Sequence, residues 1–201
     1  MEFSQITKLI EEEFEKEIIP NLCEFIKIDN LSPSFDKEWN TNGKQEKCAN
    51  FSINWVLNQK IEGIKAEIIK DSDKTPLIFI EVKEKNCLKS VLFYGHFDKQ
   101  PPLDGWAPGL GATNPVLKDG KLYGRGGADY GYSLLSSIVV IKAIQKKKNG
   151  GNHPRIIIII EGSEESGSPH LMHYVNNLKE KIAEIDLMIC LDSGGLSYYT
   201  L

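Results

Sequence analysis

Five consecutive isoleucines, Ile156 to Ile160, are the feature of this sequence that most restricts its fold. An unbroken run of β-branched apolar residues predicts a central strand that is covered on both faces. The segment from Glu161 to Gly167 follows at once and contains three glutamates. Carboxylates at the end of a buried strand are costly unless cations or water compensate them. The two segments together predict a polar site at the carboxyl end of a buried sheet.

Apolar patterns on both sides of this strand predict further strands and helices. Strands are expected at 64–68, 76–82, 90–94 and 185–191, and a hairpin turn is expected at Asp119-Gly120. Helices are expected at 6–18, where Pro20 interrupts the pattern before a second helical turn or two at 22–28, and at 49–57, 134–144 and 169–182, the last with Ser168 as its N-cap. This order predicts an α/β protein, a three-layer α/β/α sandwich with a mixed, largely parallel sheet.

Composition restricts the partners and the compartment. The net charge of −4 gives no reason to expect nucleic acid or an anionic membrane as a partner. No stretch approaches the roughly 20 apolar residues that span a bilayer, and the N-terminus lacks the basic start of a signal peptide. None of the four cysteines forms a C-x-x-C pair, and Cys190 is expected in the core, which suits a reducing compartment. A cytoplasmic protein is therefore expected.

The segment Gly95-His96-Phe97-Asp98 directly follows one of the expected strands. In extended backbone, the side chains of His96 and Asp98 point the same way. A carboxylate behind an imidazole fixes its tautomer and makes it a better metal ligand. For this pair alone, a histidine and an aspartate in a surface turn are the favoured alternative.

A glycine-rich segment, Gly124 to Asp129, precedes an expected helix. It is not a dinucleotide fingerprint, because Asp129 stands where the third glycine is needed. The glycines instead allow the backbone to approach a crowded site and leave Asp129 at the helix start. An N-cap role for Asp129 is the alternative, and one carboxylate can serve both purposes because it has two oxygens.

Glu164, Glu165 and Asp192 also follow expected strands, where ligands of open α/β sheets collect. A solvated acidic loop is the alternative for the glutamates. One imidazole with several carboxylates suits a pair of divalent metal ions, and adjacent glutamates can supply one ligand and one base, which indicates metal-assisted hydrolysis. A serine hydrolase is disfavoured because no G-x-S-x-G is present. His170 and His173 have no acidic partner in sequence and are expected to be surface or core residues.

The ordered combination of these segments resembles a known family. Similarity is strongest in 93–98, 119–129 and 164–168, and it extends from about Leu9 to Asp192. The chain resembles the dinuclear zinc metallopeptidases of family twenty, which include carnosine dipeptidase, aminoacylase, succinyl-diaminopimelate desuccinylase and glutamate carboxypeptidases. Asp192, in place of glutamate, resembles the dipeptidase and aminoacylase branch.

The resemblance implies a role for each acidic or imidazole residue. His96 would bind one metal and be oriented by Asp98, Asp129 would bridge both metals, and Asp192 would complete the first shell. Glu165 would bind the second metal, and Glu164 would be the general base. A cis peptide between Asp129 and Tyr130 is also implied.

The same resemblance implies an activity, cofactors and a substrate class. Two zinc ions, or manganese or cobalt in their place, would share a water that attacks the amide bond of a dipeptide or an N-acyl amino acid. A small peptide or N-acyl amino acid is therefore the expected partner.

Two departures from the family pattern stand out. Many relatives carry a lysine where this chain has Gly131. Relatives also continue into a lid domain, through which full-length members often form homodimers, and then supply a last histidine ligand. Residues 1–201 are therefore expected to be the N-terminal portion of a catalytic domain, weak or inactive alone. A non-catalytic remnant or binding module is the alternative, while a nucleotide-binding domain would need a phosphate loop that is not found.

Overall fold

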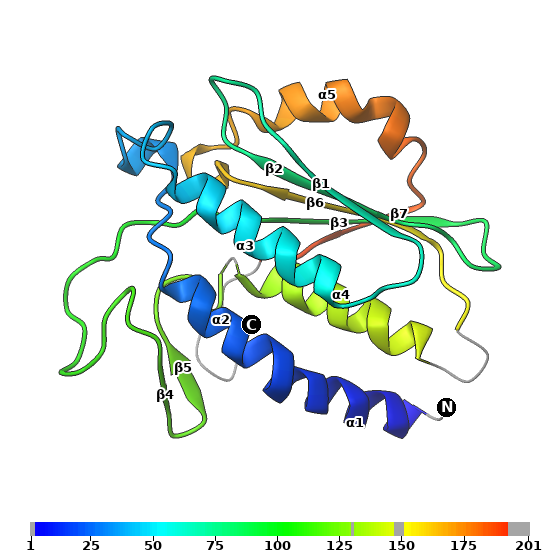
Figure 1. Cartoon of the computed structure of the whole chain (residues 1–201), viewed down its shortest axis with the longest axis horizontal. Helices are drawn as coiled ribbons and strands as arrows, with labels where there is room; N and C mark the ends of the chain where they lie inside the picture. The colour runs from blue at the N-terminus through cyan, green and yellow to red at the C-terminus, as the bar shows by residue number, and fades with distance from the viewer. Residues whose placement is uncertain (1–2, 130, 147–150, 193–201) are drawn as a thin grey trace.

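A five-stranded sheet forms the centre of the molecule, shown by a computed structural model that describes residues 3–129, 131–146 and 151–192 (Figure 1). The strand order is β1-β2-β6-β3-β7. The strands are β1 (Ile64–Ile69), β2 (Leu77–Val82), β3 (Ser90–His96), β6 (Arg155–Glu161) and β7 (Leu187–Cys190).

Helices cover both faces of this sheet, which confirms the expected three-layer α/β/α arrangement (Figure 1). One side holds α1 (Phe3–Glu13), η1 (Phe14–Ile18), α2 (Ile19–Ile26), α3 (Lys44–Asn58) and α4 (Gly131–Gln145). The other side holds α5 (Leu171–Ile182). Short 3₁₀ turns, η2 (Pro33–Phe35) and η3 (Glu164–Ser166), and a hairpin of β4 (Val116–Lys118) and β5 (Lys121–Tyr123) complete the described elements. In the described part of the chain, no helix has the length and apolar character that a membrane span requires.

The sheet is mixed and largely parallel, as expected: four of its five described strands run in the same direction, and β2 runs against them. β1 pairs antiparallel with β2 and β2 antiparallel with β6, whereas β3 pairs parallel with both β6 and β7. Because β3, β6 and β7 run in the same direction, their carboxyl ends meet at one edge of the sheet. The register places His96 opposite Glu161 at that edge.

The isoleucine run forms the central strand that the sequence predicts. Ile156, Ile158 and Ile160 pack into the apolar cluster under α1 to α4, and Ile157 and Ile159 pack into the cluster under α5. All five are at most 3% exposed. Each buried isoleucine contributes about 1.5–3 kcal/mol relative to exposure, so β6 anchors both layers.

The first helix does not stop at Pro20, contrary to the expectation. A π-helical turn, η1, joins α1 to α2, and the N–H of Ile19 donates to the carbonyl oxygen of Phe14. Pro20 occupies the first turn of α2. The wider turn accommodates a residue that lacks a backbone donor, so the chain continues as one helical segment.

Ser168 is not the N-cap of α5, which begins at Leu171 after His170. The Ser168 hydroxyl instead donates to Glu161 Oε1 at 2.7 Å. The Ser168 hydroxyl thus donates its hydrogen to a carboxylate, and α5 has no side-chain cap.

The last strand is exposed rather than buried. Leu187 and Met188 are 54% and 58% exposed, and Cys190 is also exposed. β7 is an edge strand of the described sheet, and no residue of β7 belongs to either apolar cluster.

The Asp119-Gly120 turn is confirmed. Asp119 has a φ of 52° and Gly120 a φ of 71°, the left-handed pair that a two-residue hairpin requires. β4 and β5 pair on either side of it.

A buried lysine, Lys99, joins the end of α2 to the segment after β3. Its Nζ donates to the carbonyl oxygens of Phe25 and Ile28 at 2.7 and 2.6 Å and lies 4.2 Å from the centre of the Phe25 ring. The last carbonyl oxygens of a helix lack N–H donors from the helix itself, so a cationic donor there satisfies them. Burial lowers the pKa of Lys99 to about 8.

Replacing Lys99 with methionine should destabilise the protein. The variant keeps most of the apolar stem but removes the buried ammonium donor to the carbonyl oxygens of Phe25 and Ile28, at a cost of about 1–3 kcal/mol. Urea unfolding measures this loss. Lys118→Met, at an exposed hairpin position, is the control and should change stability by less than about 0.5 kcal/mol. Equal effects of the two substitutions would contradict the assigned role.

Gly95 allows β3 to approach α4 closely. A Cβ atom at Gly95 would lie 2.5 Å from Ser133 Oγ and 2.8 Å from Ser133 Cβ. Gly95→Ala should therefore cost about 1–3 kcal/mol through overpacking. In Gly111→Ala, the new methyl group would meet only Asn114 Cβ at 3.6 Å, an ordinary contact. Thermal unfolding of the two variants tests the difference, and an unchanged Tm for Gly95→Ala would refute it.

Candidate metal centre

Three parallel strands deliver the candidate site. His96 ends β3, Glu164 and Glu165 lie in η3 after β6, and Asp192 follows β7 by two residues. Asp129 lies between β5 and α4, two residues before the helix. The carboxyl ends of β3, β6 and β7 share one edge of the sheet, so residues far apart in sequence become neighbours.

Asp98 holds the residues of the centre in place through hydrogen bonds. Its Oδ1 accepts the backbone N–H of Glu164, and its Oδ2 accepts the N–H of Glu165, both at 3.1 Å. Asp98 Oδ1 also lies 3.3 Å from His96 Nδ1. Asp98 is 0% exposed and His96 is 1% exposed. The alternative of a surface histidine and aspartate is therefore wrong for this pair.

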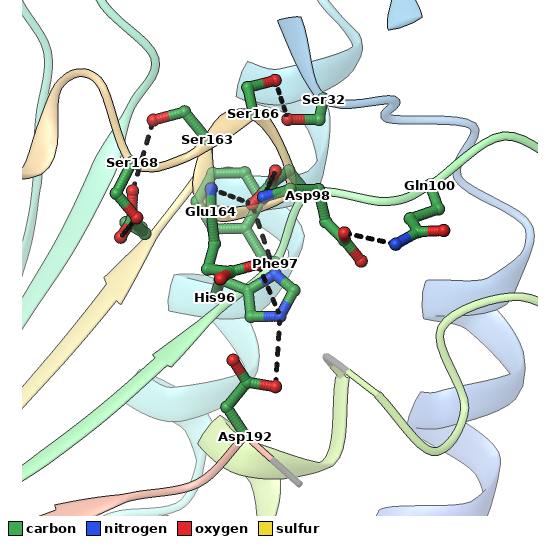
Figure 2. Close-up of polar contacts among 12 residues, drawn as sticks. Ser32, His96, Phe97, Asp98, Gln100, Ser163, Glu164, Ser166, Ser168 and Asp192 are labelled. Atoms are coloured by element: carbon green, nitrogen blue, oxygen red, sulfur yellow. Dashed lines mark hydrogen bonds and ion pairs between the residues drawn. The ribbon is translucent and has the colours of Figure 1, made fainter. Parts of the chain in front are cut away.

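The other side of the imidazole faces carboxylates. His96 Nε2 lies 3.8 Å from Glu164 Oε2 and 3.9 Å from Asp192 Oδ1. Figure 2 shows His96 between Asp98 above it and Asp192 below, with Glu164 beside the ring. With Nδ1 turned to Asp98, Nε2 is the nitrogen directed at the acidic groups.

Two groups of ligand atoms share this imidazole. His96, Asp129 and Glu165 form one group, and His96, Glu164 and Asp192 form the other; within each group the atoms lie within 4.8 Å of one another. The structure thus brings together every residue that the sequence nominates. It does not place Asp129 in the group of Asp192, and it places Glu164, the expected base, beside Asp192. The peptide bond to Tyr130 lies outside the described residues.

The crowding of charge alters the acidity of the site. Burial lowers the pKa of His96, but the hydrogen bond to Asp98 and the charges of Glu164 and Asp192 raise it to about 9. Burial raises the pKa of Glu164; His96 opposes that shift and Asp192 adds to it. Burial also raises the pKa of Glu165, opposed by a hydrogen bond from Gln100 and assisted by Asp129. Glu164 and Glu165 are half-buried and their pKa values are raised, so the alternative of a solvated acidic loop is wrong.

These residues fit divalent metal ions. One imidazole nitrogen and several carboxylate oxygens lie close enough together to bind the same ion. A cation would stabilise the ionised form of the glutamates, which burial and then neighbouring carboxylates disfavour. Imidazole and carboxylate ligands suit zinc, and the carboxylates also suit manganese or cobalt. The buried Asp98 behind His96 is the outer partner that metal-binding imidazoles usually have.

The third glutamate after the isoleucine run is not part of either group. Glu161 is 2% exposed and accepts hydrogen bonds from hydroxyl groups, so no cation is needed to stabilise its burial. His170 and His173 lie away from the centre, as expected. His173 does have an acidic partner, Asp71, which the sequence did not indicate because the two residues meet only through the packing of α5.

Gln100 is a site residue that the sequence analysis does not identify. Its Nε2 donates to Glu165 Oε2 at 2.6 Å (Figure 2). Its spacing from Asp98, two residues along an extended segment, is the one signal that could have indicated it. The Ser166 hydroxyl is also 2.5 Å from that of Ser32, which ties the glutamate turn to the segment after α2.

A buried imidazole with convergent carboxylates at strand ends defines a metal-dependent hydrolase type of centre. Residues 92–200 match the Peptidase family M20/M25/M40. The chain belongs to this family, whose members depend on metal ions.

Curated relatives and solved structures agree with this assignment. The chain is 34% identical over 129 residues to the β-Ala-His dipeptidase of Homo sapiens, covering 61% of this chain and 24% of that protein. An uncharacterized metallohydrolase of Methanocaldococcus jannaschii is 24% identical over 188 residues, covering 90% of this chain and 44% of that protein. The structure of the dipeptidase Dug1p from Saccharomyces cerevisiae is similar with a TM-score of 0.74 at 24% identity, covering 95% of this chain and 42% of that chain.

The last comparison supports the fold alone. The chain spans less than half the length of these three proteins. The family match confirms the expected family, and the structural similarity confirms the expected fold class.

Metal binding should depend on His96. Zn²⁺ at a free concentration of about 100 times its Kd should stabilise the chain by about 2.7 kcal/mol, and a chelator should reverse this effect. Thermal unfolding measures the shift. His96→Ala should lose most of it because both groups of ligand atoms use this imidazole. His173→Ala, which removes an imidazole paired with Asp71 elsewhere, should retain it, and loss of the shift in both variants would point to non-specific binding.

Proposed function

We propose that this chain contributes to a metal-dependent hydrolase that cleaves the amide bond of a dipeptide or an N-acyl amino acid. The observation that supports this most directly is the convergence of His96, Asp98, Asp129, Glu164, Glu165 and Asp192 at one edge of the sheet. Residues 1–201 belong to the catalytic domain in this proposal.

Four residues would hold two divalent ions. His96 and Asp192 would hold one, Glu165 the other, and Asp129 would lie between them. When bound, such ions supply Lewis acidity that lowers the pKa of water and polarises a carbonyl group. Zinc is favoured by the family, and the carboxylate-rich set also admits manganese or cobalt.

Glu164 would be the general base. Its backbone N–H is held by Asp98 Oδ1, so the side chain projects toward His96, with Oε2 3.8 Å from Nε2. Its raised pKa brings it closer to the working range of a group that must both accept and return a proton. In the proposed reaction, Glu164 takes a proton from the attacking water and delivers it to the leaving amine. Asp98 keeps the imidazole and both glutamate backbones in place.

A small peptide substrate is supported by the names of the relatives. The human and Saccharomyces cerevisiae proteins are dipeptidases, and a relative from Wolbachia, 31% identical over 128 residues, is a succinyl-diaminopimelate desuccinylase. These substrates share an amide bond close to a carboxylate. The substrate class proposed here is therefore a short acylated or peptidyl amino acid.

A non-catalytic binding module that retains this fold is the competing function. It would need neither Glu164 nor its raised pKa. Intact carboxylates in both ligand groups favour the hydrolase.

Glu164→Gln should separate chemistry from metal binding. Glutamine cannot accept or return the proton, so turnover should fall by about 10²–10⁴-fold while zinc content stays unchanged. The ratio of wild-type to variant turnover is measured by amine release from β-Ala-His, Cys-Gly and N-acetyl amino acids, in a zinc-loaded enzyme extended to the length of its relatives. Glu81→Gln is the matched control, because the side-chain exposure of Glu81 is 33% against 32% for Glu164 and its ion pair with Arg155 lies elsewhere. A wild-type enzyme of that extended form that binds zinc but hydrolyses none of these amides would favour the binding module.

A further inference from the structure

A second buried carboxylate, Glu161, lies behind the proposed metal centre. It ends β6 directly opposite His96 in the sheet register. Glu161 is 2% exposed and belongs to neither group of candidate ligands. The reaction proposed above assigns no role to Glu161, although burying a carboxylate costs free energy.

Three hydroxyl groups converge on this carboxylate. Tyr94 Oη donates to Glu161 Oε1 at 2.6 Å, and Ser168 Oγ donates to the same oxygen at 2.7 Å. Ser163 Oγ donates to Oε2 at 3.2 Å. An ionised carboxylate only accepts hydrogen bonds, so all three hydroxyl hydrogens are directed toward Glu161.

Two of these hydroxyls mark the ends of the turn that carries Glu164 and Glu165. The carbonyl oxygen of Ser163 accepts the N–H groups of Ser166 and Ser168 at 3.1 and 3.0 Å, which closes the turn. Ser168 has a φ of 54°, a left-handed conformation that a serine rarely adopts without support. Its bond to Glu161 supplies that support at the point where the chain turns toward α5.

The turn is therefore held from two sides. Asp98 accepts the N–H groups of Glu164 and Glu165, and Glu161 accepts the hydroxyls at the two ends. Figure 2 shows Ser163 and Ser168 on the strand side of Glu164, whereas Ser166 lies on the other side next to Ser32. We infer that Glu161 is a positioning residue that fixes the turn of Glu164 and Glu165 for metal binding, an inference that rests on the proposed function.

The chemistry of the pocket requires an acceptor at this position. An apolar residue, such as the isoleucines before it, would leave three hydroxyl groups facing a site without an acceptor. Burial raises the pKa of Glu161, and the hydrogen bonds from Tyr94 and Ser168 oppose that shift. The hydroxyl groups thus stabilise the negative charge of Glu161, as a bound metal ion would stabilise the charges of Glu164 and Glu165.

Metal affinity tests this role. Zinc dissociation constants are measured by competition with a chromophoric chelator, and the cobalt-loaded chain gives a visible spectrum that reports ligand geometry. Glu161→Leu should weaken zinc binding by about 10–100-fold and alter the cobalt spectrum, whereas Glu161→Gln, which retains an oxygen acceptor, should stay within about threefold of wild type. A purely structural role would lower the Tm of Glu161→Leu and leave affinity and spectrum unchanged.

A second pair of variants keeps the test decisive if Glu161→Leu does not fold. Tyr94→Phe combined with Ser168→Ala removes both donors to Oε1 and should weaken zinc binding in the same direction. The control variant, Ser90→Ala combined with Tyr174→Phe, also loses one serine and one tyrosine hydroxyl. These two hydroxyls donate to backbone carbonyl oxygens away from the centre, so zinc affinity should be unchanged. Wild-type affinity in the folded Tyr94 and Ser168 variant would overturn the inference while leaving the proposed function intact. A wild-type chain that binds no zinc would remove both.

Discussion

The carboxylate of Asp98 is the contact on which the rest of the site depends. It accepts two backbone N–H groups of the glutamate turn and faces the imidazole of His96. One fully buried group therefore ties the end of β3 to the loop after β6. Hydrogen bonds to an ionised acceptor are the strong ones, which explains how a charge at this depth can be tolerated. Lys99, the next residue, fastens the same segment to α2.

The three glutamate side chains at this edge of the sheet are stabilised in two different ways. Glu161 is surrounded by hydroxyl donors from Tyr94, Ser163 and Ser168. Burial raises the pKa of all three glutamates, but Glu164 and Glu165 have fewer such donors to oppose that shift. Their charge is left for a cation to balance, which is the property that a metal-dependent hydrolase requires. This difference distinguishes Glu161, which is inferred to position the turn, from Glu164 and Glu165, which are proposed to act as the base and as a metal ligand.

Features that depend on nearby residues could be predicted from the sequence. The isoleucine run predicted a strand covered on both faces, because β-branched apolar residues have few other stable environments. The Asp119-Gly120 turn followed from the left-handed backbone that these residues tolerate. Predictions failed where a distant partner decided the outcome. Ser168 bonds Glu161 rather than α5, and Pro20 is accommodated by a π turn rather than ending the helix.

The sequence by itself determined the class of fold, the family and the residues of the candidate site, since residue types and their order carry that information. The tertiary structure alone decided how those residues group around His96 and which glutamate is excluded. It also decided that Cys190 is exposed, since burial of β7 depends on neighbours rather than on its own apolar residues. The reason is physical: hydrogen-bond partners such as Asp98 and Glu164, separated by 66 positions, are chosen by the register of β3 against β6.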